Sequence, residues 1–193
     1  MTFLQYHNAE KLGWVPFDER PFLQTRLGIT TRVTAVRETV GERVHLVARV
    51  GVPARYYLWD TFTVEGVEQR EEGWWAWGTG WQLCPPALLE GEAFEAFRKA
   101  CAYFFGFRRI DGLPYCAVLD ALADRHRGLP LGEEAERFCT GLINWRPESG
   151  DCRYFRAFVR EARGDRRGAA GDWAEALRLG TEFAAHVPGG EGR

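Results

Sequence analysis

The chain has 193 residues, enough for one large domain or two small ones with a hydrophobic core of useful size. Its formal net charge of −2 argues against a general polyanion-binding protein, because such a domain is normally clearly basic. No apolar run reaches the roughly 18 residues that a membrane span needs, and no charged and then apolar leader opens the chain. The five cysteines show no C-x-x-C spacing, which indicates reduced thiols in a bacterial-type cytoplasmic protein.

The first expected elements are a short strand at Phe3 to Tyr6 and a long ordered loop from Ala9 to Leu27. Glycine, two prolines and several large apolar residues give the loop its anchors, and long loops inside compact domains often carry function. Two threonines at 30–31 then precede a short helix predicted for about Thr31 to Thr39.

The stretch from Gly41 to Trp81 is predicted to form the centre of the first domain. Apolar and polar residues alternate along 43–50 and along 56–65, as in strands with one buried face, so a hairpin is expected. A connection of five residues, 51–55, would place Arg49 opposite Tyr57 and Val47 opposite Trp59. A third strand is expected at 75–83, ended by the two prolines at 85–86.

After residue 88 the apolar period changes to steps of three and four residues. These steps run through Phe94, Phe97, Cys101, Phe104 and Phe105. The spacing predicts an amphipathic helix whose apolar stripe packs on the sheet.

After residue 115 the sequence is helical and repetitive. Residues 116–149 align with residues 150–183 at a period of 34, which places Ala123 over Ala157 and Ala135 over Ala169. This period and the segment 164–179 resemble tetratricopeptide repeats. The resemblance implies two helical hairpins, fewer than a free-standing solenoid needs, so they would pack against the first domain, the helix after Gly180 or another chain.

Tryptophan and tyrosine side chains concentrate in the predicted hairpin and in the strand after it. Such a cluster either builds the core or supplies an aromatic slot that stacks a nucleobase. Seven arginines against two acidic residues between positions 20 and 55 are either scattered surface charges or a patch that reaches a phosphate. The candidate nucleic-acid-binding residues are Arg43, Arg49, Arg55, Tyr57, Trp59, Trp77 and Trp81.

A second resemblance covers about residues 3–67. An aromatic residue opens the first strand, a Gly-Ile-Thr-Thr loop at 28–31 leads into a short helix, and Val-Gly-Glu-Arg-Val at 40–44 opens another strand. This pattern resembles the EVE- and YTH-type members of the PUA-like superfamily, which have Asp in place of Glu42. The resemblance implies a small open barrel that binds a modified base in an aromatic pocket.

Catalytic chemistry is the less favoured reading. A histidine, an arginine and a carboxylate can together cleave RNA by general acid–base catalysis, and His45 is expected to face Thr61 across the hairpin. No nucleophile elbow, phosphate loop or metal-binding motif is present, so no catalytic residue, metal or cofactor is assigned. The polar residues considered for such a role are His7, Asn8, His45, Asp60 and Glu65.

The first helix of the second repeat carries four arginines at steps of three and four residues, namely Arg153, Arg156, Arg160 and Arg163. This stripe would clamp an acidic partner tail or nucleic-acid phosphates. If it is a solvated face balanced by Glu161 and Asp165, it has no binding role.

The sequence therefore predicts an α+β protein. Residues 1–115 would form a PUA-like small open β-barrel or sheet with packed helices, and residues 116–193 would form all-α tetratricopeptide-like hairpins. The predicted function is non-catalytic recognition of a nucleotide or modified base of DNA or RNA, while the repeats recruit a protein partner. The alternatives are a pure protein–protein adaptor and a small RNA-processing enzyme that uses His7 or His45.

Overall fold

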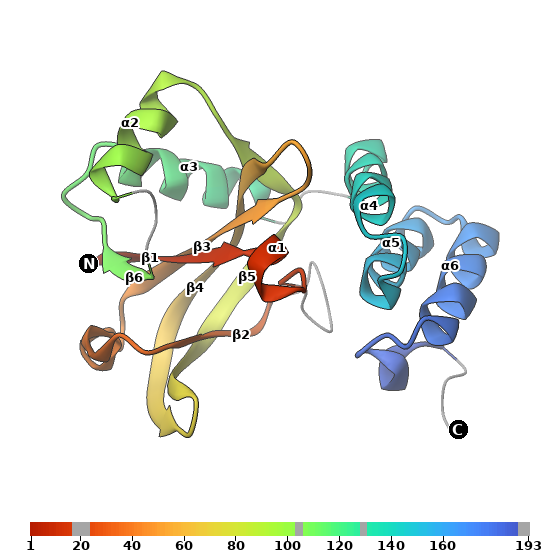
Figure 1. Cartoon of the computed structure of the whole chain (residues 1–193), viewed down its shortest axis with the longest axis horizontal. Coiled ribbons are helices and arrows are strands. Elements are labelled where there is room, and N and C mark those ends of the chain that lie inside the picture. The colour runs from red at the N-terminus through yellow and green to blue at the C-terminus, as the bar shows by residue number, and fades with distance from the viewer. Residues whose placement is uncertain (17–23, 103–105, 128–130, 189–193) are drawn as a thin grey trace. The chain divides into compact units, whose positions relative to one another are not determined.

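The computed structural model describes residues 1–16, 24–102, 106–127 and 131–188 (Figure 1). The chain divides into two compact units, and the described residues of the first are 1–16, 24–102 and 106–127, while those of the second are 131–188. The first unit contains β1 (Thr2–Asn8), α1 (Ala9–Leu12), β2 (Gln24–Thr31), the 3-10 helix η1 (Thr34–Glu38), β3 (Arg43–Val50), β4 (Arg55–Arg70), β5 (Gly73–Leu89), α2 (Glu92–Ala100), β6 (Phe107–Arg109) and α3 (Cys116–His126). The second contains α4 (Glu133–Trp145), α5 (Gly150–Ala162), α6 (Arg166–Arg178) and the 3-10 helix η2 (Ala184–His186).

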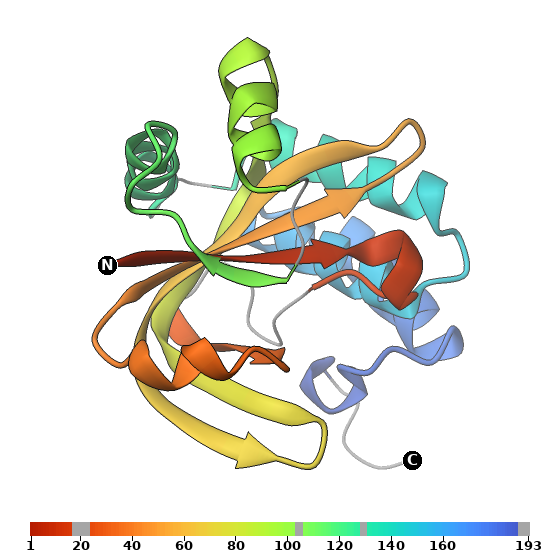
Figure 2. The same cartoon turned by 60° about the vertical axis from the view of Figure 1, so that its left-hand side comes forward.

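The first unit is built on a six-stranded mixed sheet with the strand order β2-β5-β4-β3-β1-β6. β1 and β3 run parallel, and the other neighbouring strands run antiparallel. The hairpin of β4 and β5 extends away from α2 and α3 (Figures 1 and 2). In the described residues no helix has both the length and the apolar character needed to cross a membrane.

The predicted barrel is corrected by this topology. Barrel closure requires the two edge strands to pair with each other, and in the described residues β2 pairs with β5 and β6 with β1, but β2 and β6 do not pair. β6 is only three residues long, so it offers little backbone to a further strand. The sheet is therefore open.

The predicted tetratricopeptide-like region is also corrected. α3 was expected to open the first repeat, but its Leu119 and Ala123 are fully buried in one core cluster with Leu83 of β5. The apolar face of α3 is thus used by the sheet of the first unit. The 34-residue spacing of alanines reflects small residues at helix contacts and does not produce two stacked hairpins from residue 116 onward.

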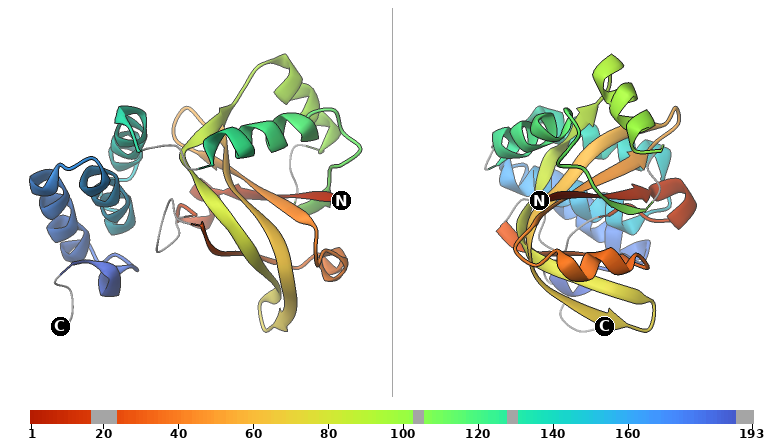
Figure 3. Two further views of the ribbon diagram at one scale, coloured as in Figure 1. Left: turned by 180° about the vertical axis from the view of Figure 1, so that it is seen from behind. Right: turned by 90° about the vertical axis from the view of Figure 1, so that its left-hand side faces the viewer.

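The strand ladder sorts side chains onto two faces of the sheet, because paired residues of neighbouring strands project from the same face. On the face here called the α3 face, Leu58 shares a core cluster with Leu119 of α3. On the face here called the η1 face, Phe62 shares a cluster with Val36 of η1. Figure 3 shows α3 and η1 beside different halves of the sheet.

A β-bulge at Trp59 changes the predicted register of the central hairpin. The loop between β3 and β4 has four residues, so Arg49 pairs with Tyr56 and Val47 with Leu58, one position from the prediction. The extra residue of the bulge then restores the expected offset. His45 consequently pairs with Thr61, and this part of the prediction is confirmed.

β5 continues through the two prolines that were predicted to end it. The ladder between β4 and β5 passes from Gln82 to Ala87 without a paired residue in between. Pro85 and Pro86 lie in this irregular stretch, where a missing backbone N–H removes no ladder hydrogen bond. The strand therefore resumes after the prolines and ends at Leu89.

Two other predicted elements differ in extent. The predicted loop at 9–27 contains α1 and the first part of β2, while its residues 17–23 lie outside the described residues. The predicted amphipathic helix is α2, whose Phe94 and Phe97 are buried against the sheet. Phe104 and Phe105 lie outside the described residues.

The second unit is held together by small residues opposite aromatic ones. Ala157 of α5 and Ala169 of α6 are fully buried beside Tyr154 and Trp173, so the two helices approach closely. Side-chain caps fix the starts of both helices, because Ser149 accepts a hydrogen bond from the Cys152 N–H and Asp165 accepts one from the Gly168 N–H.

Candidate functional site

Three tryptophans of β5 project from the α3 face of the sheet. Trp75, Trp77 and Trp81 are separated by even numbers of residues, and successive side chains of a strand alternate between faces. Trp81 confirms the direction, since its Nε1–H donates to the Ala123 carbonyl of α3 at 3.2 Å. Trp74 projects from the η1 face and packs against the core cluster there. The three side chains of the row are partly exposed.

Two of these rings lie against the sheet because glycines make room for them. A Cβ atom on Gly28 of β2 would lie 2.3 Å from Cη2 of Trp75, and one on Gly66 of β4 would lie 2.5 Å from Cζ2 of Trp77. Each indole therefore occupies the space of a missing side chain on the neighbouring strand.

An arginine lies over each of the three rings. The guanidinium carbon is 4.7 Å from the ring centroid for Arg70 over Trp75, 3.6 Å for Arg26 over Trp77 and 4.8 Å for Arg127 over Trp81. Cation–π contacts of this kind at exposed sites contribute about 0.5–1 kcal/mol each. These six residues are here called the tryptophan–arginine surface.

The two arginines over Trp77 and Trp81 have no carboxylate partner in the described residues. Arg26 and Arg127 are exposed, and no carboxylate in the described part of the chain pairs with either. Arg70 is different, because its Nε donates to Glu68 at 2.5 Å. The two unpaired guanidinium groups can therefore offer N–H donors to an anion without breaking an internal ion pair.

The predicted nucleic-acid-binding residues are divided by the fold. Trp77 and Trp81 belong to the tryptophan–arginine surface. Trp59 is fully buried at the bulge, so it builds the core and cannot stack on a ligand, which corrects its prediction. Arg55 and Tyr57 pair with Val50 and Ala48 and so project from the η1 face.

Arg43 and Arg49 lie on the α3 face but are engaged by carboxylates. Arg43 donates to Asp120 at 2.9 Å, and Arg49 lies 3.5 Å from Glu10. These two arginines therefore link the sheet to α3 and α1. They do not join the three tryptophans.

Sequence reasoning missed Arg70 and Arg127, and it considered Trp75 in the aromatic cluster and Arg26 in the arginine patch without assigning either to the site. Positions 75, 77 and 81 are all odd, and in a regular strand such residues project from the same face. The sequence could therefore have grouped Trp75 with Trp77 and Trp81. The arginines come from β2, β4 and the end of α3, so no local spacing connects them with the tryptophans.

The two cavities that the structure shows in the described residues lie away from the tryptophans. A cavity of about 500 Å³ lies along α4, and another of about 310 Å³ lies between α2 and α3. No tryptophan lines either cavity. Among the described residues no group of three or more His, Cys, Asp or Glu side chains could hold a metal ion.

His45 meets a carboxylate, as a catalytic role would require, but it is fully buried. Its Nε2 lies 3.1 Å from Oδ1 of Asp120, the same oxygen that accepts from Arg43. The hydrogen bonds from His45 and Arg43 lower the pKa of Asp120 to about 2. This carboxylate attaches α3 to β3. Because a substrate cannot reach the imidazole, the geometry favours a structural role for His45 over the RNA-processing alternative.

His7, the other histidine considered for catalysis, is also buried. Its ring contacts the edge of Trp14 at a centroid distance of 4.3 Å, and its Nε2 has no hydrogen-bond partner in the described residues. Burial lowers the pKa of His7 to about 4. The imidazole is therefore neutral and shielded at neutral pH.

Acidification should destabilise the first unit through His7. The unfolded chain binds a proton near pH 6.5 but the folded protein only near pH 4, so the free energy of unfolding falls as the pH drops through this window. At about pH 5 we expect a loss of about 2 kcal/mol relative to neutral pH. Urea unfolding of the wild type and of His7→Gln at both pH values measures this loss. A wild-type pH dependence as shallow as that of His7→Gln would contradict the burial of a neutral imidazole.

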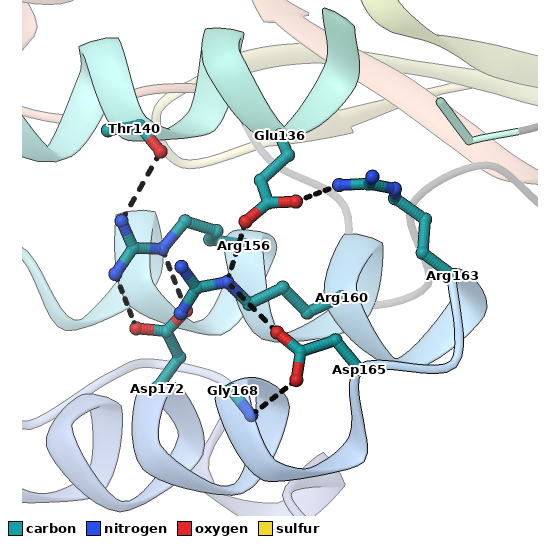
Figure 4. Close-up of polar contacts among 8 residues, drawn as sticks. All are labelled: Glu136, Thr140, Arg156, Arg160, Arg163, Asp165, Gly168 and Asp172. Atoms are coloured by element: carbon teal, nitrogen blue, oxygen red, sulfur yellow. Dashed lines mark hydrogen bonds and ion pairs between the residues drawn. The ribbon is translucent and has the colours of Figure 1, made fainter. Parts of the chain in front are cut away.

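Three arginines of the predicted partner-binding stripe are neutralised inside the second unit (Figure 4). Arg156 forms two hydrogen bonds to Asp172, at 2.7 and 2.6 Å, and Arg160 donates to the same carboxylate at 2.9 Å. Glu136 of α4 pairs with Arg160 and with Arg163. The balancing carboxylates are therefore mainly Asp172 and Glu136.

An acidic partner would have to compete with these internal ion pairs. Arg153 is partly buried, and its Nε has no hydrogen-bond partner among the described residues. The geometry thus gives the stripe a structural role in joining α4, α5 and α6. Asp165, the other carboxylate considered, caps α6 through the Gly168 N–H.

In comparisons with protein-family models, curated proteins and solved structures, nothing matches this chain. Functional inference therefore rests on the geometry of its own residues. The tryptophan–arginine surface is the strongest candidate, because it combines exposed aromatic area with unpaired positive charge.

Proposed function

We propose that the first unit binds nucleotides or nucleic acid through the tryptophan–arginine surface. The observation that carries this proposal is the stack of Arg26 on Trp77, with 3.6 Å between guanidinium carbon and ring centroid, on an open face of the sheet. Bases stack on aromatic rings and on guanidinium planes, and guanidinium N–H groups bind phosphate. The same side chains can thus contact both chemical parts of a nucleotide.

The charge distribution supports local binding without a strongly basic protein. The net charge of the chain is −2, so long-range attraction to polyanions is weak. Two unpaired arginines beside two partly exposed tryptophans provide a short cationic and aromatic track. Binding should therefore be modest and should weaken as salt rises, in proportion to the few phosphates contacted.

Two further parts of the proposal concern context. All five cysteines are free and buried, which supports a reducing compartment such as the cytoplasm. The resemblance to PUA-like domains agrees with recognition of a base and remains a prediction, as does a protein partner.

The proposal is tested by titrating the full chain with short DNA and RNA oligonucleotides while recording tryptophan fluorescence at low salt. We expect quenching on binding, and a loss of affinity of about fivefold or more in Trp77→Leu, because stacking of one base contributes about 1–3 kcal/mol. Circular dichroism establishes that the variant folds.

Trp145→Leu is the matched control. Trp145 is also partly exposed and also lies beneath an arginine, Arg146 at 4.6 Å, but it belongs to α4 in the second unit. The control should bind like the wild type. Absence of binding at low salt, or equal losses in both variants, would overturn the proposal.

A further inference from the structure

We infer that the tryptophan–arginine surface takes the unpaired bases of a single strand in preference to a duplex. This inference rests on the proposed function and adds the class of nucleic acid. It follows from the flat groups of the surface, from the spacing of the rings along β5 and from the position of the arginines.

The flat groups of this surface do not fit the paired, stacked bases of a duplex. Trp75 and Trp77 fill the spaces above Gly28 and Gly66, and Arg70 and Arg26 lie over these two rings, so the surface offers guanidinium planes and the uncovered parts of the rings to a ligand. Only a base with an uncovered face can stack on such a surface. In the interior of a duplex both faces of every base are covered by neighbouring pairs, and only the edges and the phosphates are accessible.

The spacing of the rings requires bases that are separated from one another. Trp75 and Trp77 are two residues apart on β5, which corresponds to about 6.6 Å along the strand. Bases of a B-form strand follow each other at about 3.4 Å. Neighbouring bases can stack at neighbouring tryptophan–arginine pairs only if the nucleic-acid chain is extended and its bases are unstacked, as in a single strand.

The arginines are part of the stacking platform. The Arg26 guanidinium lies directly over the indole of Trp77, so a base above Trp77 meets the guanidinium plane first. A guanidinium is flat and stacks on bases, whereas a lysine ammonium carries the same charge without a plane. Arg26 therefore contributes shape as well as charge.

The experiment compares a labelled single-stranded RNA and DNA of mixed sequence with the same sequences as duplexes, by fluorescence anisotropy of the full chain at about 50 and 200 mM salt. We expect the single strands to bind about tenfold or more tightly than the duplexes. We expect Arg26→Lys to bind single strands about fivefold or more weakly than the wild type, because lysine keeps the charge but has no plane on which a base can stack.

Arg55→Gln is the control for charge alone. Arg55 is exposed and projects from the η1 face, so its removal lowers the net charge without touching the surface. Little change in this variant, together with the loss in Arg26→Lys, supports the inference. Equal binding of single strands and duplexes, or wild-type binding by Arg26→Lys, overturns the inference but leaves the proposed function standing. Absence of binding to every oligonucleotide overturns both.

Discussion

Replacement of Gly78 by alanine is expected to destabilise the first unit by about 3 kcal/mol or more. A Cβ atom at this position would lie 1.7 Å from the carbonyl oxygen of Thr63 and 2.7 Å from its carbonyl carbon. Both atoms belong to the backbone of β4, which is held in the centre of the sheet by β3 and β5. A rotamer change therefore cannot relieve the clash, and the β4–β5 ladder has to move.

Urea unfolding of the full chain, followed by tryptophan fluorescence, measures this loss. Gly112→Ala is the matched control, because no atom lies within 4 Å of a Cβ built at Gly112. The control should remain within about 0.5 kcal/mol of the wild type. A Gly78→Ala variant as stable as Gly112→Ala would show that β4 and β5 do not pair in the register around Val64.

Asp172→Asn should destabilise the second unit by about 3 kcal/mol or more. The Asp172 side chain is 6% exposed and that of Arg156 is 12% exposed, so water cannot replace the lost counterion. Asparagine retains one oxygen acceptor but turns an amide N–H₂ toward a guanidinium group. Arg156 would then be a buried cation without its counterion, keeping one hydrogen bond to residue 172 and its bond to Thr140, while Arg160 would retain its contacts to Glu136 and Asp165.

Hydrogen exchange of the α5 and α6 amides is the appropriate measurement, because it reports on this unit alone. Glu175→Gln, one turn further along α6, is the control. The ion pair of Glu175 with Arg178 is solvent-exposed, so its loss should change the free energy of opening measured by hydrogen exchange by less than about 0.5 kcal/mol.

A second variant separates loss of the ion pair from general intolerance of the site. Asp172→Leu combined with Arg156→Met replaces both charges by apolar groups, and a substantial part of the stability should return. Exchange rates in Asp172→Asn that match those of the wild type would show that the carboxylate is not the internal counterion of the arginine stripe.

Local sequence patterns predicted an element correctly where its buried residues recur with the period of a strand or a helix. The alternation along β3 and β4 predicted their hairpin, and the three- and four-residue steps through Phe94 and Phe97 predicted α2. The pairing of His45 with Thr61 was also predicted correctly, although the predicted loop was one residue too long and the bulge was not foreseen. The shorter loop and the bulge at Trp59 cancel each other beyond the bulge.

The environment of Trp59 involves a local irregularity of the ladder. Continued regularly from the pair of Val47 with Leu58, the ladder would place Trp59 opposite Leu46, but the bulge leaves Trp59 without a pair in β3, and its side chain is fully buried. Trp77 and Trp81 keep their alternation because β5 pairs without interruption from Trp74 to Trp81 with β2. No pattern in the sequence marks the position of the bulge.

In the helical part of the chain, too, local spacing did not predict which elements pack together. A spacing of 34 residues between small side chains is compatible with repeats and with any helices that pack closely. The contacts of Leu119, Asp120 and Ala123 with the sheet assign α3 to the first unit. Likewise, the four arginines of α5 were visible in the sequence, while their counterions Asp172 and Glu136 come from other helices and were not.

The sequence by itself determined the β3–β4 hairpin and the helix α2, since these depend on the spacing of apolar residues within a short segment, but it did not mark α1, the start of β2 or β6. It also indicated that aromatic and arginine side chains gather in the N-terminal half. Only the tertiary structure decided which of them meet. Gly28 and Gly66 make room for the rings, and β2, β4 and α3 bring Arg26, Arg70 and Arg127 over them. These contacts join residues far apart in the chain, and their formation depends on strand order, register and helix placement, which no local period encodes.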